Sequence, residues 1–168
     1  MAQYLSADYE KFYRKTDHHF NLYGAYETYL RIMEYVNAHY RTAPVTEGLE
    51  ITPVDSSFLG SRNRKLFGLF QSDDRLYTYT LADPVPFERY DNGNPVEATV
   101  FAADRQNMYN YYMGGDVAET VIHTNRPELP DVLVVGDSFT NALETILYTS
   151  FDEMRSLDFR HYTEKSIY

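Results

Sequence analysis

The chain has 168 residues, with 15 basic and 25 acidic side chains and a formal net charge of −10. This length suits a single domain, residues 1–168, and the acidic balance excludes a sequence-independent nucleic-acid binder and disfavours an anionic membrane surface. There are no cysteines, which excludes disulfide and thiolate chemistry. No apolar stretch reaches transmembrane length and no signal peptide is recognisable, so we expect a soluble chain.

The first half of the chain opens with a clear helix signal. Apolar side chains recur at helical spacing over residues 22–40, and Asn21 before them suits an N-cap. Residues 41–53 are typical of a loop that can include one short strand. Residues 56–70 mix glycine with the basic cluster Arg62, Arg64 and Lys65. This cluster is open to two interpretations, a solvated loop or a contact for an acidic polysaccharide.

The second half alternates strands with turn-rich segments. Residues 83–95 contain three prolines and predict a connector, and residues 104–113 predict a short helix ending at a double glycine. A helix is predicted from Ser138 to about residue 151. The predicted strands are residues 75–81, 119–124, 132–135 and 154–160. The last two strands and the helix between them should form a right-handed parallel β-α-β unit.

Two polar motifs carry the residues of a nucleophilic site. Ser138 follows the apolar strand at 132–135, at a strand-to-helix turn where backbone N–H groups can meet an oxyanion. Asp17 and His19 share a face of an extended segment, so His19 can act as general base with Asp17 as its orienting partner. His18 is the alternative base.

Each motif also has a simpler interpretation. Ser138 could be only a helix cap, and the segment from Asp17 to His19 could be half of a metal site or a polar turn. The metal interpretation needs a third ligand, for which His123 and His161 are available. No recognised metal-binding spacing connects them, so we expect neither a metal nor a cofactor.

Five short motifs, in order along residues 13–162, give the chain a recognisable resemblance. It resembles the bacterial DHHW family of SGNH hydrolase-like proteins, which is similar to the alginate O-acetylation proteins in placing an Asp-x-His motif ahead of Gly-Asp-Ser. The motifs are Thr16-Asp17-His18-His19-Phe20, Gly24-Ala25-Tyr26, Tyr112-Met113-Gly114-Gly115-Asp116, the segment from Gly136 to Leu143, and Leu157-Asp158-Phe159-Arg160-His161-Tyr162.

The resemblance implies a fold, a site and a cellular context. The fold is α/β, an SGNH-hydrolase-like three-layer arrangement with a small parallel sheet and an irregular β-rich insertion, present here as a fragment of a longer protein. The implied context is the bacterial cell surface, with any membrane contact made through a missing N-terminal segment. The implied catalytic residues are Ser138 as nucleophile, His19 as base and Asp17 as orienter.

The chain departs from the family pattern at two side chains. Phe20 stands where tryptophan is expected, a conservative aromatic change. Asp116 stands where asparagine is expected, and its carboxylate would repel a developing oxyanion that an amide could have bound.

The function expected from these residues is acyl transfer on an acylated carbohydrate or polysaccharide, as an esterase or an O-acetyltransferase. Ser138 would form the acyl-enzyme, with Gly114 or Gly115 supplying an oxyanion N–H. Arg160 and Tyr112 are the candidate substrate contacts. The alternative is a non-catalytic surface or carbohydrate-binding protein that retains the fold.

Overall fold

The computed structural model describes residues 9–40, 42–54, 57–69, 72–106 and 108–163. Its centre is a five-stranded sheet of order β4-β3-β5-β7-β6, accompanied by the β1-β2 pair. The strands are β1 (Glu50–Pro53), β2 (Tyr77–Thr80), β3 (Glu88–Asp91), β4 (Asn94–Val96), β5 (Glu119–His123), β6 (Val132–Gly136) and β7 (Glu153–Asp158). The predicted strands at 75–81, 119–124, 132–135 and 154–160 are therefore present with slightly different ends.

The five-stranded sheet is mixed. β6 and β7 pair in parallel, from Val132 opposite Met154 to Gly136 opposite Asp158, as the sequence predicts. The other three pairings are antiparallel. The expected small parallel sheet is thus corrected to one parallel pair extended by antiparallel strands, because β3, β4 and β5 do not arrive through helical crossovers.

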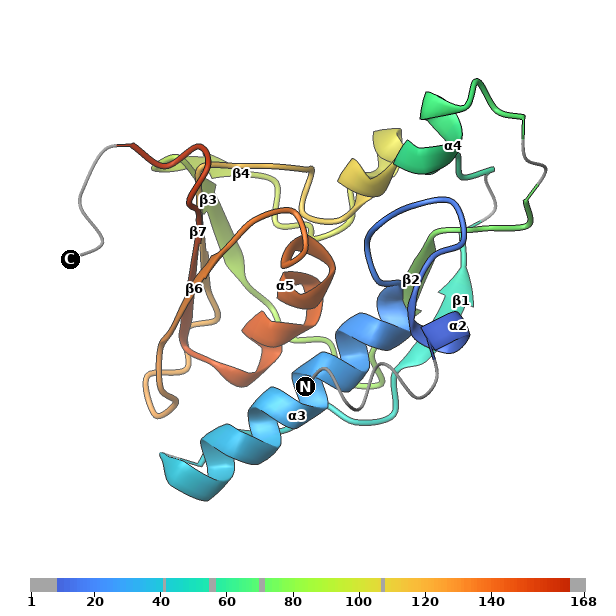
Figure 1. The fold of residues 1–168 in the computed structure, drawn as a ribbon. Helices are drawn as coiled ribbons and strands as arrows, with labels where there is room; N and C mark the ends of the chain where they lie inside the picture. The colour runs from blue at the N-terminus through green and yellow to red at the C-terminus, as the bar shows by residue number, and fades with distance from the viewer. Residues whose placement is uncertain (1–8, 41, 55–56, 70–71, 107, 164–168) are drawn as a thin grey trace.

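The helices α3 (Leu22–His39) and α5 (Asn141–Leu147) pack on one side of this sheet (Figure 1). α5 follows β6, and α3 packs against α5. Asn21 caps α3 by accepting a hydrogen bond from the Gly24 N–H at 3.0 Å, which confirms the predicted start of this helix. The shorter helices are α2 (Tyr9–Phe12), α4 (Ser61–Lys65), η1 (Ala103–Arg105), η2 (Tyr109–Tyr111) and η3 (Tyr148–Ser150).

The two faces of β6 differ in burial. Val132 and Val134 pack against the main core, whereas Leu133 and Val135 are 56% and 46% exposed on the opposite face. Successive side chains of a strand point to opposite faces, so this alternation follows from the pleat. Of the three predicted layers, the described residues show the sheet and the helical layer on its inner side.

The segments at 83–95 and 104–113 differ from expectation. The predicted connector at 83–95 contains the β3-β4 hairpin, closed by Asn92 and Gly93 with φ of 50° and 77°. Asparagine and glycine readily adopt the left-handed backbone conformation that this two-residue turn requires. Pro84 and Pro86, which precede β3, favoured the prediction of an irregular connector instead. The helix predicted at 104–113 is instead the 3₁₀ pair η1 and η2, and its residue 107 lies outside the described residues.

Candidate active site

Ser138 lies in a turn between β6 and α5. Hydrogen bonds between the residues next to Ser138 hold this turn in place. The Phe139 N–H donates to the Asp137 carboxylate at 2.9 Å, and the Thr140 N–H and hydroxyl both donate to the Asp137 carbonyl at 2.9 Å. α5 begins only at Asn141, three residues after Ser138. A short local hydrogen-bond set therefore fixes the place of this side chain.

His19 lies on the loop of residues 13–20, whose two ends lie side by side. Tyr13 and Phe20 form an isolated β-bridge, and the Arg14 N–H donates to the His19 carbonyl at 3.3 Å. Glycine is needed next to this loop, because a Cβ at Gly60 would lie 2.3 Å from the Thr16 carbonyl oxygen. The loop and α4 can approach so closely only without that side chain.

The structure brings Asp17, His19 and Ser138 together across the chain. His19 Nε2 lies 2.9 Å from Ser138 Oγ, and His19 Nδ1 lies 2.5 Å from Asp17 Oδ1. An ionised carboxylate can only accept, so Nδ1 carries the imidazole proton and Nε2 faces the serine hydroxyl as an acceptor. This geometry suits proton transfer from Ser138 to His19.

Asp17 is 2% exposed and is held by several donors. The Ser61 N–H donates to its Oδ2 at 2.6 Å, and the His19 N–H donates to its Oδ1 at 3.1 Å. Burial by itself raises the pKa of Asp17, but the hydrogen bonds from His19 and Ser61 outweigh burial and hold this pKa well below its usual value. The carboxylate is therefore ionised wherever the imidazole can serve as base.

His18 has a different environment from His19. Its side chain is 45% exposed, and its Nδ1 lies 2.8 Å from Ser61 Oγ. Burial and the neighbouring His19 lower the pKa of His18. Of the two histidines that the sequence left open as the base, His19 is the one placed beside Ser138.

Two aromatic side chains whose contact with His19 the sequence did not predict pack against the imidazole. The Tyr109 ring stacks on His19 with centroids 3.6 Å apart and planes 5° from parallel, and the Phe139 ring lies 4.9 Å from it. Such packing fixes the plane of the imidazole and keeps water from its faces. Phe139 could have been singled out because it directly follows the nucleophile, and Tyr109 is marked in the sequence only by its tyrosine cluster close to the double glycine.

The double glycine lies beside the nucleophile turn. Gly115 lines the same small cavity as Asp137 and Asn141. The Gly115 N–H already donates to the Tyr112 carbonyl at 3.1 Å, whereas none of the described residues accepts from the Gly114 N–H. Of the two predicted oxyanion donors, Gly114 is therefore the one with an N–H to offer.

Asp116 is held in an ion network. Arg160 Nη2 lies 3.0 Å from Asp116 Oδ2, and the Asn141 side-chain amide donates to Asp116 Oδ1 at 3.4 Å. Arg160 also binds Asp158 through Nε at 3.0 Å and Nη2 at 2.5 Å, and these bonds lower the pKa of Asp158 against the opposing effect of burial. The Asp116 carboxylate is thus compensated by a guanidinium, which offsets the repulsion expected from its charge.

Tyr112 does not reach the surface. It is 0% exposed, and its hydroxyl accepts from Arg14 Nη2 at 3.0 Å and donates to the Tyr77 carbonyl at 2.9 Å. The expected substrate contact at Tyr112 is therefore wrong, because a side chain enclosed in the core has no face to present. Arg160 is 36% exposed and keeps part of its guanidinium accessible.

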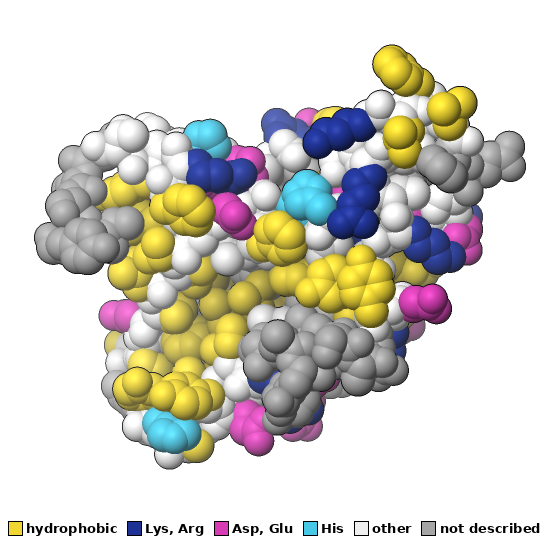
Figure 2. All heavy atoms as spheres, in the orientation of Figure 1, with side chains coloured by type: hydrophobic (Ala, Val, Ile, Leu, Met, Phe, Trp, Pro, Cys, Tyr) yellow, Lys and Arg dark blue, Asp and Glu magenta, His cyan; other side chains and the backbone are white. Residues whose placement is uncertain are grey.

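The basic cluster Arg62, Arg64 and Lys65 is exposed on α4, next to the loop of His19. In Figure 2, dark-blue basic side chains gather on this part of the surface. The sequence predicted a loop here, but the three side chains lie on the helix α4. Their exposure is compatible with a solvated surface and with a contact for an acidic polysaccharide. Residues 56 and 70 of the predicted basic loop lie outside the described residues.

Two sets of side chains bring three possible ligand atoms within 4.8 Å of one another: Asp17, His18 and His19, and Asp116, Asp158 and His161. In both sets the carboxylates already have partners, Asp17 with His19 and Ser61, and Asp116 and Asp158 with Arg160. The distances alone therefore give no reason to place an ion in either set.

Among known proteins, the chain is similar to several solved structures. No protein-family model and no curated protein matches the chain. The structure of Bacillus cereus PatB1 with a sulfonyl adduct is similar, with a TM-score of 0.76 and 26% identity over 99% of this chain and 60% of that one. Another PatB1 structure gives a TM-score of 0.72 and 24% identity over 99% and 61%.

A DHHW family protein from Eubacterium siraeum DSM 15702 is also similar. Its TM-score is 0.73, with 20% identity over 94% of this chain and 55% of that one. The predicted α/β fold class is thus confirmed. The chain spans about three fifths of the length of the PatB1 structures that it matches. Among the described residues, no helix is both long and apolar enough to cross a membrane.

Proposed function

We propose that this chain is an acyl-transfer protein of the DHHW type, SGNH-like in its site, in which Ser138, His19 and Asp17 act as nucleophile, base and orienter. The observation that carries the proposal is the continuous set of contacts from Asp17 through both ring nitrogens of His19 to Ser138 Oγ. Three polar residues from segments more than a hundred residues apart share one hydrogen-bonded line, as nucleophilic catalysis requires.

The proposed reaction uses both ring nitrogens of His19. His19 Nε2 takes the Ser138 hydroxyl proton while Oγ bonds to the ester carbonyl carbon, and Asp17 stabilises the imidazolium through Nδ1–H. The tetrahedral intermediate expels the alkoxide, which takes the proton from Nε2 and leaves the acyl group on Ser138. Water or a sugar hydroxyl then gives its proton to His19 Nε2 and bonds to the acyl carbon; the bond from this carbon to Ser138 Oγ breaks, and Oγ takes the proton back from Nε2.

The oxyanion and the substrate complete the proposal. We assign the oxyanion to the N–H groups of Ser138 and Gly114, and the exposed part of Arg160 to contact with the substrate. The family resemblance favours an acylated carbohydrate at the bacterial cell surface, and the similarity to PatB1 supports acyl transfer. Hydrolase and O-acetyltransferase differ only in whether water or a sugar hydroxyl accepts the acyl group.

Labelling the serine tests this proposal directly. PatB1 has been solved with a sulfonyl adduct, so a sulfonyl fluoride and a fluorophosphonate are suitable probes for this chain. Intact-mass spectrometry should show one adduct on the wild type and none on Ser138→Ala. Ser57→Ala, which removes an exposed serine, is the matched control and should label fully.

Activity on p-nitrophenyl acetate, with and without an oligosaccharide acceptor, separates the two acyl-transfer outcomes. Acetate release alone indicates a hydrolase, and an acetylated oligosaccharide in the products indicates a transferase. Undiminished labelling and turnover in Ser138→Ala would reject the catalytic site. The non-catalytic carbohydrate-binding protein would then be the better description.

A further inference from the structure

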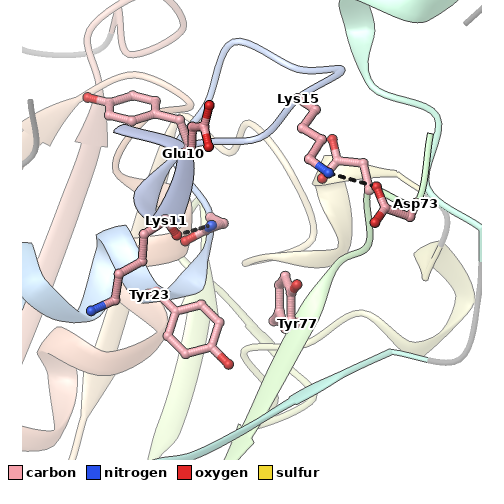
Figure 3. A pocket seen from close by; sticks show the side chains of 9 residues that line it. Glu10, Lys11, Lys15, Tyr23, Asp73 and Tyr77 are labelled. Carbon is pink, nitrogen blue, oxygen red and sulfur yellow. Dashed lines mark hydrogen bonds and ion pairs between the residues drawn. The ribbon is translucent and has the colours of Figure 1, made fainter. Parts of the chain in front are cut away.

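A second hollow lies apart from the three candidate catalytic side chains, none of which lines it. It is bounded by α2, the loop of residues 13–20, the start of α3 and the segment leading into β2, and it has a volume of about 250 Å³. Figure 3 shows its open centre, with Glu10 and Lys11 on one side, Lys15 and Asp73 across from them, and two tyrosine rings below. We call this hollow the tyrosine groove.

Three tyrosines give the groove its apolar surfaces. The rings of Tyr23 and Tyr77 meet edge to face, with centroids 5.4 Å apart and planes at 70°, and Tyr13 joins them in the lining. Tyr23 is 36% exposed, and Tyr13 and Tyr77 are partly exposed. Within the described part of the chain, none of the three hydroxyls makes a hydrogen bond, so each has a ring face and a polar tip to offer a ligand.

The charges around the groove have mixed signs. Lys15 Nζ lies 2.9 Å from Asp73 Oδ1, and both side chains are well exposed, at 68% and 82%. Glu10 adds a carboxylate, and the Lys11 ammonium points away from the open centre in Figure 3. A small anion would meet the carboxylates, and a small cation would have to displace Lys15 from Asp73, so neither is favoured.

A saccharide fits this combination better than an ion does. Each sugar hydroxyl can donate to a carboxylate and accept from an ammonium or a phenol, and the C–H face of a sugar ring packs against an aromatic face. Uncharged sugars avoid repulsion by the overall net charge of −10, which acts against polyanionic chains.

The groove shares a wall with the loop that carries His19. Alternate side chains of this loop point in opposite directions: Tyr13 and Lys15 line the groove, and Arg14 between them is 2% exposed and donates to the Arg75 carbonyl at 2.6 Å. Asp74, also in the lining, accepts from the N–H and hydroxyl of Thr16 at 3.0 and 2.8 Å. The residue before Asp17 is thus bound to the groove wall.

We propose that the tyrosine groove binds a neutral saccharide chain, with sugar rings against Tyr23 and Tyr77 and hydroxyls on Lys15, Asp73 and the free phenols. Its role as a remote subsite for the substrate rests on the proposed function, whereas binding itself does not. The groove and the candidate site share the loop of residues 13–20, so a substrate chain long enough to extend past this loop would gain affinity in the groove without touching the reacting ester there.

Binding is measured on Ser138→Ala protein, so that chemistry cannot interfere. The probes are cellotetraose, maltotetraose and N-acetylchitotetraose as neutral chains, with tetragalacturonate as the acidic comparison, followed by calorimetry and by amide shifts in NMR. At least one neutral probe should bind and shift amides of residues 13, 23 and 77. Tyr23→Ala should weaken that binding at least about fivefold, the size expected from loss of one aromatic contact.

The matched control is Tyr35→Ala, which removes another exposed tyrosine of the same helix, 56% exposed and away from the groove. It should leave the affinity unchanged. Tyr77→Phe keeps the ring and should weaken binding less than Tyr23→Ala does. On p-nitrophenyl acetate, which cannot reach the groove and the nucleophile together, Tyr23→Ala should turn over as the wild type does.

Three results would overturn the groove proposal. They are no binding by any neutral probe, equal losses in Tyr23→Ala and Tyr35→Ala, and binding of tetragalacturonate alone with shifts at Arg62 and Lys65. A failure of serine labelling combined with saccharide binding in the groove would reject the proposed chemistry and leave the groove as a binding site.

Discussion

The two segments that supply the candidate site are built in opposite ways. Apart from the 3.4 Å bond of the Asn141 amide to Asp116, the nucleophile turn is held mainly by bonds within residues 137–141, whereas the loop of residues 13–20 depends on several residues far away in sequence. Ser61 reaches Asp17, Asp74 reaches Thr16, and Arg14 reaches Tyr112. The turn should therefore tolerate distant changes, and the loop should be the part of the site that such changes disturb.

The largest loss of turnover should come from removing the catalytic side chain of either segment, Ser138 in the turn or His19 in the loop. Ser138→Ala and His19→Ala should each lower kcat/KM for p-nitrophenyl acetate at least on the order of 10³-fold, because each removes a group that takes part in bond formation. The double variant should be no slower than either single variant, since the two act as one unit. Multiplying losses would mean that His19 and Ser138 act separately.

Gly60→Ala should disturb the loop and spare the turn. Its new Cβ would lie 2.3 Å from the Thr16 carbonyl oxygen, so the backbone must shift, at a cost of about 1–3 kcal/mol in the free energy of unfolding. Turnover should fall with it, because Asp17 follows Thr16 directly. Leu59→Ala, a neighbouring change at a 41% exposed side chain, is the control. Urea unfolding and ester hydrolysis measure both, and wild-type values for Gly60→Ala would contradict this account.

Asp17→Asn should affect both turnover and the pH dependence of stability. The ring proton loses its charged acceptor, so kcat should fall, but roughly tenfold to a hundredfold less than in His19→Ala. The folded pKa of Asp17 lies below its ordinary value of 3.8, so its stabilisation is complete above that pH and is lost as the pH falls toward the folded pKa.

Urea unfolding of Asp17→Asn and wild type between pH 3 and pH 7 checks this sign. The stability difference should be constant at neutral pH and should shrink as the pH falls through 3.8, because the unfolded wild type then binds a proton at Asp17 while the folded state stays ionised. Curves that stay parallel down to the lowest pH would show that Asp17 is not ionised against its partners.

Asp116→Asn probes the surroundings of the nucleophile turn. Because Arg160 compensates the carboxylate at 3.0 Å and both side chains are 36% exposed, the amide should change the hydrolysis rate by less than about threefold. A tenfold rise would show that the negative charge faces the oxyanion after all. Arg160→Gln, which leaves Asp116 uncompensated, should be slower than Asp116→Asn.

The smallest effect is expected for His18→Ala. Its imidazole is 45% exposed and contacts Ser61 Oγ, so turnover should stay within about twofold of the wild type. Equal losses for His18→Ala and His19→Ala would contradict the assignment of His19 as the base. Steady-state hydrolysis at one pH is sufficient for this comparison.

The sequence determined the elements whose signals are local. The cap at Asn21, the apolar run into Gly136 and the turn at Ser138 depend on neighbouring residues, and their predicted positions agree with the structure. Asp17 and His19 do meet as predicted, but in a bend of residues 15–19, where the His19 N–H donates to Asp17 Oδ1, and not in an extended segment. A period or a cap is set by backbone geometry that a short segment already contains.

Only the tertiary structure decided what meets across the chain. Tyr112, selected from its place near the double glycine, is enclosed in the core, while Tyr109, three residues earlier, stacks on His19. Asp116 departs from the family pattern, and only the tertiary structure places Arg160 beside it to compensate its charge. The antiparallel strand pairing and the tyrosine groove were likewise not predictable from the sequence. Both depend on packing between distant segments, which no local sequence pattern indicates.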